Sequence, residues 1–412
     1  MPANTNMTDI ANLPALAELT SGAIADIARA VGEPDWLVEQ RVESWDFFAQ
    51  AAPPEWRRTD LTRLQPEGIS PPAGVQGTEI IWDETLSKQG VVFTSLREAL
   101  HSHEALIRTK MGMAVEPLSH KFSALRASLW QDGVFLYVPR NAEIEAPVQV
   151  RYTLPAGSRA IFPRSLVILE PNARVTFIER YVSDDMAESA LAGPVTEIFA
   201  GAGSEVRFIS VQQWGANVFH LGGQMVVLER DAGCEWTSIA LGGQAQHVEA
   251  ETRLKGDGSR VTWNGATFAN RDQQLLTGPW LRHIGANAES FMQFKTIVTE
   301  GGYSVFDGMI KIEHESRGTS TRLEEHAIHL SPNARSDSIP GLKIDTNDVA
   351  KAGHASTSGQ VDEEQLFYMQ SRGISKDDAK RLIVMGFFEP ALNAIPVADL
   401  RDELAAAIEA KI

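Results

Sequence analysis

The 412-residue chain has a single cysteine, Cys234, so it lacks a disulfide framework, a paired-cysteine redox motif and any metal or iron–sulfur site built only from its own thiolates. Basic residues are also scarce, because 37 Lys and Arg stand against 54 Asp and Glu and give a net charge of −17. A field of this sign repels phosphate. The composition therefore argues against nucleic acid or an anionic membrane as the main partner.

Long hydrophobic runs are missing as well. No apolar stretch approaches the roughly 20 residues that a bilayer-spanning helix needs. The first twenty residues contain neither the basic start nor the apolar segment of a signal peptide, so we expect a soluble, cytoplasmic protein. The strong catalytic motifs are absent too: there is no P-loop, no dinucleotide-binding glycine motif, no serine-hydrolase elbow and no HExxH.

The first third of the chain shows helical periodicity. Apolar residues recur at helical spacing over 16–31, 34–51 and 95–111. A proline- and glycine-rich stretch, 65–77, is typical of a connector. We therefore predict a mostly helical N-terminal region over residues 1–120.

The middle of the chain changes to short strand-like runs and carries a repeat. Each copy is an apolar residue, a turn residue followed by Ala or Gly, and a return to apolar residues. Steps of 31, 30, 29, 26, 30 and 46 residues separate the copies, which begin at Val138, Leu169, Phe199, Leu228, Leu254, Ile284 and Leu330. Asn, Asp or Gly at one fixed place predicts a tight corner, and a regular step of this length is typical of a solenoid. We predict a β-helix core over 121–360; an antiparallel sandwich is the alternative.

Helical patterns return near the C-terminus. Short helices are predicted over 362–370 and 379–388, the second with a capping box from Ser375 to Asp378, and Pro396 begins an amphipathic stretch. The predicted C-terminal helical region is 361–412. Its apolar residues would either cap the open end of the solenoid or bind in a hydrophobic groove of a partner protein. The spacing of the apolar residues does not distinguish these alternatives.

Three groups of residues are candidates for a functional role. The glycine pairs Gly222–Gly223 and Gly242–Gly243 read as turns between strands. Within Glu324–His329, the two histidines have opposite parity on a strand and would face opposite sides, so a shared metal site is not expected. His354 falls in a predicted loop between the last strand and the first C-terminal helix, where a lone histidine is either structural or functional.

One stretch, Gln365–Ile374, resembles the LFYxxSRG signature of the SufB/SufD family of iron–sulfur cluster assembly proteins. The resemblance runs in family order from about residue 45 to 390, and its other matching stretches are 55–60, 133–139, 164–181, 304–308 and 340–344 leading to His354.

Within this family the chain is more similar to the SufD branch. The SufB branch carries a functional cysteine in the strand before the Pro340 region, where this chain has Glu325 and no cysteine. SufB also tends to place Glu after the matching histidine, where Ala355 stands here. The SufD pattern around the histidine is often KCSH, and here His354 is kept while Ala352 replaces the cysteine.

The resemblance implies a right-handed parallel β-helix with helical N- and C-terminal parts, and a role as a non-enzymatic scaffold subunit. Such a subunit would form a heterodimer with a SufB-like protein, dock a SufC-like ATPase and take part in iron acquisition. His354 would be an iron or cluster ligand at the SufB interface. The chain alone would hold no cofactor tightly, although iron or a cluster could pass through the interface. The residues that would dock the ATPase are Phe387, Phe388, Leu400 and Leu404.

Two other functions remain as alternatives. A SufB-like cluster-holding scaffold would need several thiolates, and Cys234 is alone. A β-helix carbohydrate-active enzyme would need clustered carboxylates on one face. The nearest such pair, Glu249 and Glu251, has no second strand of acids beside it.

Overall fold

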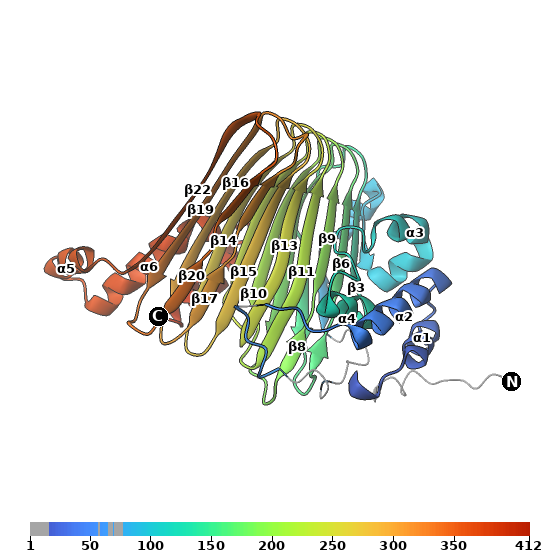
Figure 1. Cartoon of the computed structure of the whole chain (residues 1–412), viewed down its shortest axis with the longest axis horizontal. Coiled ribbons are helices and arrows are strands. Elements are labelled where there is room, and N and C mark those ends of the chain that lie inside the picture. The colour runs from blue at the N-terminus through green and yellow to red at the C-terminus, as the bar shows by residue number, and fades with distance from the viewer. Residues whose placement is uncertain (1–15, 57, 65–68, 70–76) are drawn as a thin grey trace.

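The computed structural model describes residues 16–56, 58–64, 69 and 77–412. Most of the predicted connector over 65–77 lies outside these residues, as does the start of the chain. The middle of the chain winds into a solenoid with two long sheets (Figure 1). Consecutive coils pair in parallel, which confirms the β-helix and excludes the antiparallel sandwich.

The first sheet contains one strand from each coil. In spatial order these are β1 (Thr78–Ile81), β4 (Val148–Leu154), β7 (Arg174–Ser183), β10 (Glu205–Gln213), β12 (Gly233–Ala240), β14 (Arg260–Ala269), β16 (Glu289–Val298), β19 (Thr319–His329) and β22 (Val349–Gln360). Only the β1–β4 pair is antiparallel among the described strands of this sheet.

The second sheet forms the opposite wall. Its main path is β2 (Val92–Ser95), β3 (Gly133–Val138), β6 (Arg164–Leu169), β9 (Val195–Ala200), β11 (Val218–Leu228), β13 (Ala245–Leu254), β15 (Gln274–His283), β17 (Tyr303–Phe306) and β20 (Arg335–Ser338). Shorter strands extend four coils: β5 (Ala160–Ile161), β8 (Ala190–Ala192), β18 (Met309–Ile312) and β21 (Gly341–Ile344).

The sequence repeat corresponds to the corner that leads from the second sheet to the first. Positive φ angles occur at the same place in successive coils, at Asn141, Asn172, Gly203, Asp231, Gly258, Asn287 and Gly318. Each corner N–H donates to a carbonyl of the next coil, as Asn141 does to Pro171 at 3.1 Å. Asn and Gly tolerate this conformation, which explains why the repeat keeps them.

The predicted copy of the repeat at Leu330 is wrong. Leu330 follows β19 of the first sheet and therefore belongs to the opposite corner. The seventh corner of the predicted kind is at Gly318, whose N–H donates to Asp348. This explains the irregular step of 46 residues.

The two glycine pairs differ in position. Gly242–Gly243 connects β12 to β13, as predicted, with Gly243 at φ +81°. Gly222–Gly223 lies inside β11, so the predicted turn is wrong there. A Cβ at Gly222 would come within 2.7 Å of His220 Nε2, and one at Gly223 within 3.1 Å of Val115. Close packing, not chain reversal, accounts for this pair.

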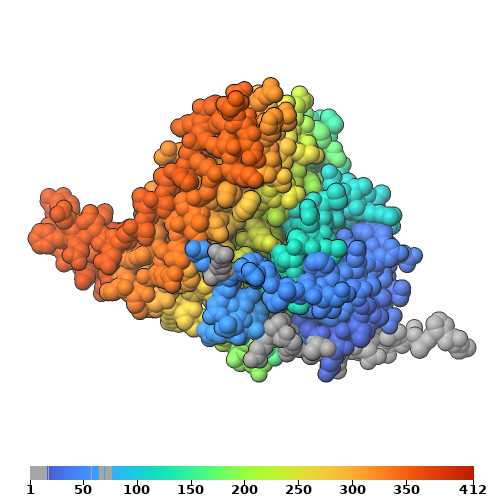
Figure 2. Space-filling view, viewed as in Figure 1, coloured from blue at the N-terminus to red at the C-terminus, as the bar shows by residue number. Residues whose placement is uncertain are grey.

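Helices at the N-terminal end pack on the outer face of the second sheet (Figures 1 and 2). They are η2 (Leu16–Glu18), α1 (Ser21–Ala30), α2 (Asp35–Gln50), α3 (Leu96–Lys110) and α4 (Lys121–Leu129). Their apolar side chains form a cluster with the sheet that includes Leu37, Leu125, Phe135 and Leu166. The short helix η4 (Glu84–Gln89) instead places Leu86 in the core of the solenoid. The first parallel strand of the solenoid, β3, begins at Gly133, after α4.

The C-terminal region contains α5 (Glu363–Ser371), α6 (Lys376–Asn393) and α7 (Ala398–Glu409). The Ser375 hydroxyl caps α6 by accepting the N–H of Asp378, as the capping box predicts. Helices α6 and α7 cover the outer face of the first sheet rather than the end of the solenoid. Helix α5 stands clear of the body (Figures 1 and 2).

Candidate functional site

The last coil leaves an open end. Among the described residues, β22 pairs only with β19, β20 only with β17 and β21 only with β18. The 12-residue β22 therefore presents a long free edge. An edge of this kind has backbone N–H and C=O groups available for pairing with another chain.

His354 lies in the middle of β22, so the predicted junction loop is wrong. It is in register with Leu323, whose side chain lies in the solenoid core. Because side chains alternate along a strand, His354 shares the inward face with Ala352, which packs against the same core. His354 is nevertheless exposed, since no further coil covers it.

A polar group next to His354 joins the two sheets at this end. On the same face of β22, Ser356 Oγ lies 2.9 Å from Glu325 Oε2 and 2.7 Å from Ser338 Oγ of β20. Glu325 is 1% exposed, and burial raises the pKa of its carboxyl. Glu325 is thus a buried, hydrogen-bonded carboxyl at the open end.

The two histidines of β19 have different neighbours. His326 Nδ1 is 2.7 Å from Thr357 Oγ1, on the outward parity of β22. His329 Nε2 is 2.8 Å from Ser336 Oγ in β20, on the inward side. They face opposite sides, as predicted. Within the part of the chain that the structure describes, no three His, Cys, Asp or Glu side chains are grouped to hold a metal ion.

The only cysteine is far from this end in the coil order. Cys234 lies in β12, faces the lumen and is 3% exposed. Burial raises the pKa of its thiol, so it stays protonated and is a poor ligand. At the open end, by contrast, β22 exposes the imidazole of His354 and contains no cysteine.

The four residues predicted to dock the ATPase instead pack α6 and α7 against the first sheet of the same chain. Phe388, Leu400 and Leu404 are 1%, 3% and 0% exposed. They form one cluster with outward-facing residues of the first sheet, among them Ile178 and Ile239. Phe387 is partly buried in the same cluster, where Lys295 Nζ lies 4.7 Å from its ring centroid.

A partner that docks on these helices in this conformation would meet other residues. Phe367 and Tyr368 of α5 are 73% and 60% exposed, and Leu382 of α6 is 54% exposed. The apolar stripes of the sequence could not distinguish an internal contact from an external one. The LFY segment itself contains the exposed aromatic residues.

The carboxylate pair considered for glycan hydrolysis is engaged in structural contacts. Glu249 Oε1 is 2.7 Å from His120 Nε2, and its Oε2 is 2.9 Å from Arg126. Burial opposes ionisation, but these partners outweigh it and lower the pKa of Glu249 to about 2. Glu251 accepts a hydrogen bond from Arg253 at 3.0 Å. A general acid must carry a proton at the working pH, and Glu249 is ionised there, so it is unsuited to this role.

Two family models match the chain. Residues 152–387 match the SufBD core domain of SUF system FeS cluster assembly, and residues 81–150 match the SufBD protein N-terminal region. The chain belongs to the SufB/SufD family.

Relatives with both names are found within this family. The iron–sulfur cluster assembly protein SufD of Bacillus subtilis is 31% identical over 333 residues, covering 80% of this chain and 76% of that protein. SufB of the same organism is 28% identical over 420 residues, covering 92% and 90%. A SufBD family protein of Staphylococcus saprophyticus is 27% identical over 92% of this chain.

The SufB/SufD chain is thus an iron–sulfur cluster assembly protein of the SUF system. Because the identities to SufB and to SufD are similar, they do not decide between the two branches of the family. None of the helices in the described ranges is both long enough and apolar enough to cross a membrane.

Proposed function

We propose that this chain is a SufD-like scaffold subunit, which pairs through the open end of its solenoid with a SufB-like subunit. The observation that supports this most strongly is β22, a long edge strand whose inward face carries His354 but no cysteine. A free edge supplies backbone hydrogen bonds to a second β-helix, and its polar inward face avoids exposing an apolar core.

The chemistry of the open end supports the SufD-like assignment. His354 is exposed and Ala352 has no thiol, so this chain offers one imidazole ligand and no thiolate. Imidazole binds iron, whereas stable cluster ligation normally needs several thiolates. Iron or a nascent cluster is the cargo of the complex, and His354 would contact it at the interface with the SufB-like partner, in keeping with a role in iron acquisition.

Helix α5 and the start of α6 are the proposed ATPase dock. Phe367, Tyr368 and Leu382 form the exposed apolar part of a segment that projects from the body. Exposed aromatic residues of this kind are typical of a docking surface. Because α6 and α7 are packed on the first sheet, movement of an ATPase on this segment would pull on the strands. In this reading the chain itself has no catalytic activity and works in the cytoplasm.

The test is reconstitution with SufB-like and SufC-like proteins from the same source. Light scattering after size-exclusion chromatography should show a stable complex with one copy of this chain. A chain that remains separate from the SufB-like protein at concentrations well above those in the cell would contradict the proposal.

The SufB-like alternative is favoured by one observation, the match to SufB over 92% of this chain. Anaerobic reconstitution of the isolated chain with iron and sulfide separates the two functions. A SufD-like chain should show no cluster absorption in the visible range, whereas a cluster-holding scaffold should retain it after desalting.

A further inference from the structure

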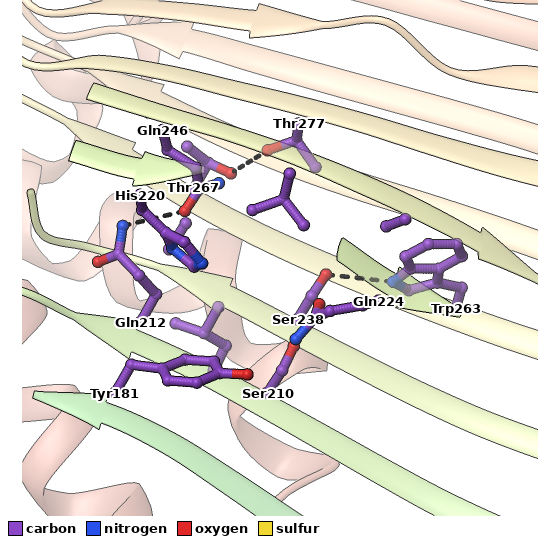
Figure 3. A pocket seen from close by; sticks show the side chains of 14 residues that line it. Tyr181, Ser210, Gln212, His220, Gln224, Ser238, Gln246, Trp263, Thr267 and Thr277 are labelled. Atoms are coloured by element: carbon purple, nitrogen blue, oxygen red, sulfur yellow. Dashed lines mark hydrogen bonds between the residues drawn. The ribbon is translucent and has the colours of Figure 1, made fainter. Parts of the chain in front are cut away.

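A small cavity lies inside the solenoid, between the two sheets (Figure 3). Its volume is about 40 Å³. Side chains from β7, β10, β12 and β14 face it from the first sheet, and side chains from β11, β13 and β15 face it from the second. Most of these side chains carry a polar group, although Ser, Thr and Gln are mostly exposed in folded proteins.

Some of the polar groups around the cavity make only long hydrogen bonds. Thr267 Oγ1 and Thr277 Oγ1 are 3.5 Å apart, and Ser210 Oγ is 3.5 Å from the amide oxygen of Gln224. The Gln246 amide nitrogen reaches a backbone carbonyl only at 3.4 Å. Hydrogen bonds in proteins are usually about 2.5–3.0 Å long from a hydroxyl and about 2.7–3.2 Å long from an N–H group, so these contacts are all longer than usual.

His220 adds an unpaired group to the same wall. The side chain is 3% exposed, and its Nδ1 atom has no hydrogen-bond partner among the residues that the structure describes. Burial, helped by the charge of Arg126 outside the sheet, lowers the pKa of His220 to about 3. The ring is therefore neutral near pH 7 and has one acceptor nitrogen. A buried polar atom left without a partner costs about 1–3 kcal/mol.

We propose that this cavity is a binding site for ordered water. One water needs at least about 10–15 Å³ of such volume, so the cavity accommodates roughly three molecules. Each buried water makes two to four hydrogen bonds, and the six stretched or unpaired side-chain groups named above supply two for each of three molecules. The volume excludes larger ligands, since an apolar cavity that binds benzene measures about 150 Å³.

Water at this place would connect two networks of the lumen. On one side Tyr181 Oη reaches Thr196 Oγ1 at 3.4 Å, and Thr196 donates to the buried carboxylate of Glu179 at 2.6 Å. On the other side Gln212 donates to Gln246 at 2.9 Å (Figure 3). The bound water bridges these side chains across the lumen, so polar residues stabilise the interior where apolar packing is absent.

Aromatic rings close the side of the cavity that faces the last coil of the solenoid. Phe294 and Phe306 have ring centroids 5.2 Å apart in the coils that follow, and Phe294 leans over Gly265 beside the cavity. Because these rings lie between the cavity and Glu325, we expect the water to exchange slowly with solvent.

The test combines crystallography with a count of long-lived internal water by oxygen-17 magnetic relaxation dispersion. A crystal structure at a resolution that shows ordered solvent should contain water within hydrogen-bond distance of His220 Nδ1 and of the Thr267 and Thr277 hydroxyls. The double variant Thr267→Val/Thr277→Val keeps the shape of both side chains and should lose at least one long-lived water. The matched control is Thr296→Val in β16, the buried register partner of Thr267 in the next coil, which does not line the cavity and should keep the wild-type count.

A cavity without solvent density in the wild-type crystal would overturn the proposal. So would equal relaxation counts for the wild type and the double variant. If the double variant does not fold, the wild-type structure decides the question alone.

Discussion

Replacing Leu404 by Ala tests whether the C-terminal helices are part of the folded body. Leu404 is 0% exposed and lies in the cluster that α6 and α7 form with the first sheet. Truncating a buried leucine to alanine costs about 2–5 kcal/mol. Because this cluster lies outside the solenoid lumen, the cost should appear as local undocking of the two helices, with the β-helix intact.

A loss of about 3 kcal/mol increases the population of the undocked state roughly 150-fold. Native-state hydrogen exchange measures this directly, through faster exchange of amides in α6 and α7 while β14 keeps its protection. The matched control is Leu382→Ala on the exposed side of α6, which should change exchange little because its side chain is 54% exposed. Unchanged exchange in the Leu404 variant, or equal loss of protection in β14, would refute the reasoning.

The remaining predictions concern the N-terminal contact, the open end and the projecting helix. The pKa of Glu249 is about 2 in the folded chain, below its ordinary 4.5, so its contribution to stability is complete above pH 4.5 and disappears as the pH falls through 2. Glu249→Gln should therefore lower the urea midpoint at pH 7, and the difference from wild type should shrink in acid; a constant difference would contradict this. His354→Ala should slow cluster assembly by the reconstituted complex without changing the melting temperature, and an unchanged assembly rate would rule out a role in ligation. Phe367→Ala/Tyr368→Ala should weaken ATPase binding at least tenfold by calorimetry, whereas Trp280→Ala, at an exposed tryptophan on the second sheet, should leave it unaltered.

The repeat could be predicted from sequence because a corner needs a special backbone conformation. Asn141 and Asn172 adopt positive φ, which few residue types tolerate. The residue type at a corner therefore indicates the turn in the sequence itself. The corner that leads from the first sheet to the second can contain similar residues. For this reason the copy at Leu330 resembles the repeat although it belongs to that other corner. A local pattern shows that the chain turns, but it does not show from which sheet.

The sequence did not predict strand β22 around His354, for a different reason. Strands are recognised by alternating apolar side chains, and β22, with the sequence VAKAGHASTSGQ, has few because no coil covers its inward face. The same lack of covering makes His354 accessible. The feature that obscured the strand is therefore the one that suggests its function.

Contacts between distant residues could not be foreseen. Glu249 meets His120 and Arg126, which precede it by more than 120 positions in the chain. The same holds for Leu404, whose partners lie on the first sheet. An amphipathic helix indicates that one face will be buried, but only the tertiary structure identifies the surface that buries it.

The most direct test of the proposed function is hydrogen exchange of β22 in the free chain and in the complex with a SufB-like partner. If the open end is the pairing surface, amides of β22 should become strongly protected on complex formation, while the corners near Asn141 should not change. A stable complex in which β22 exchanges as in the free chain would contradict the account.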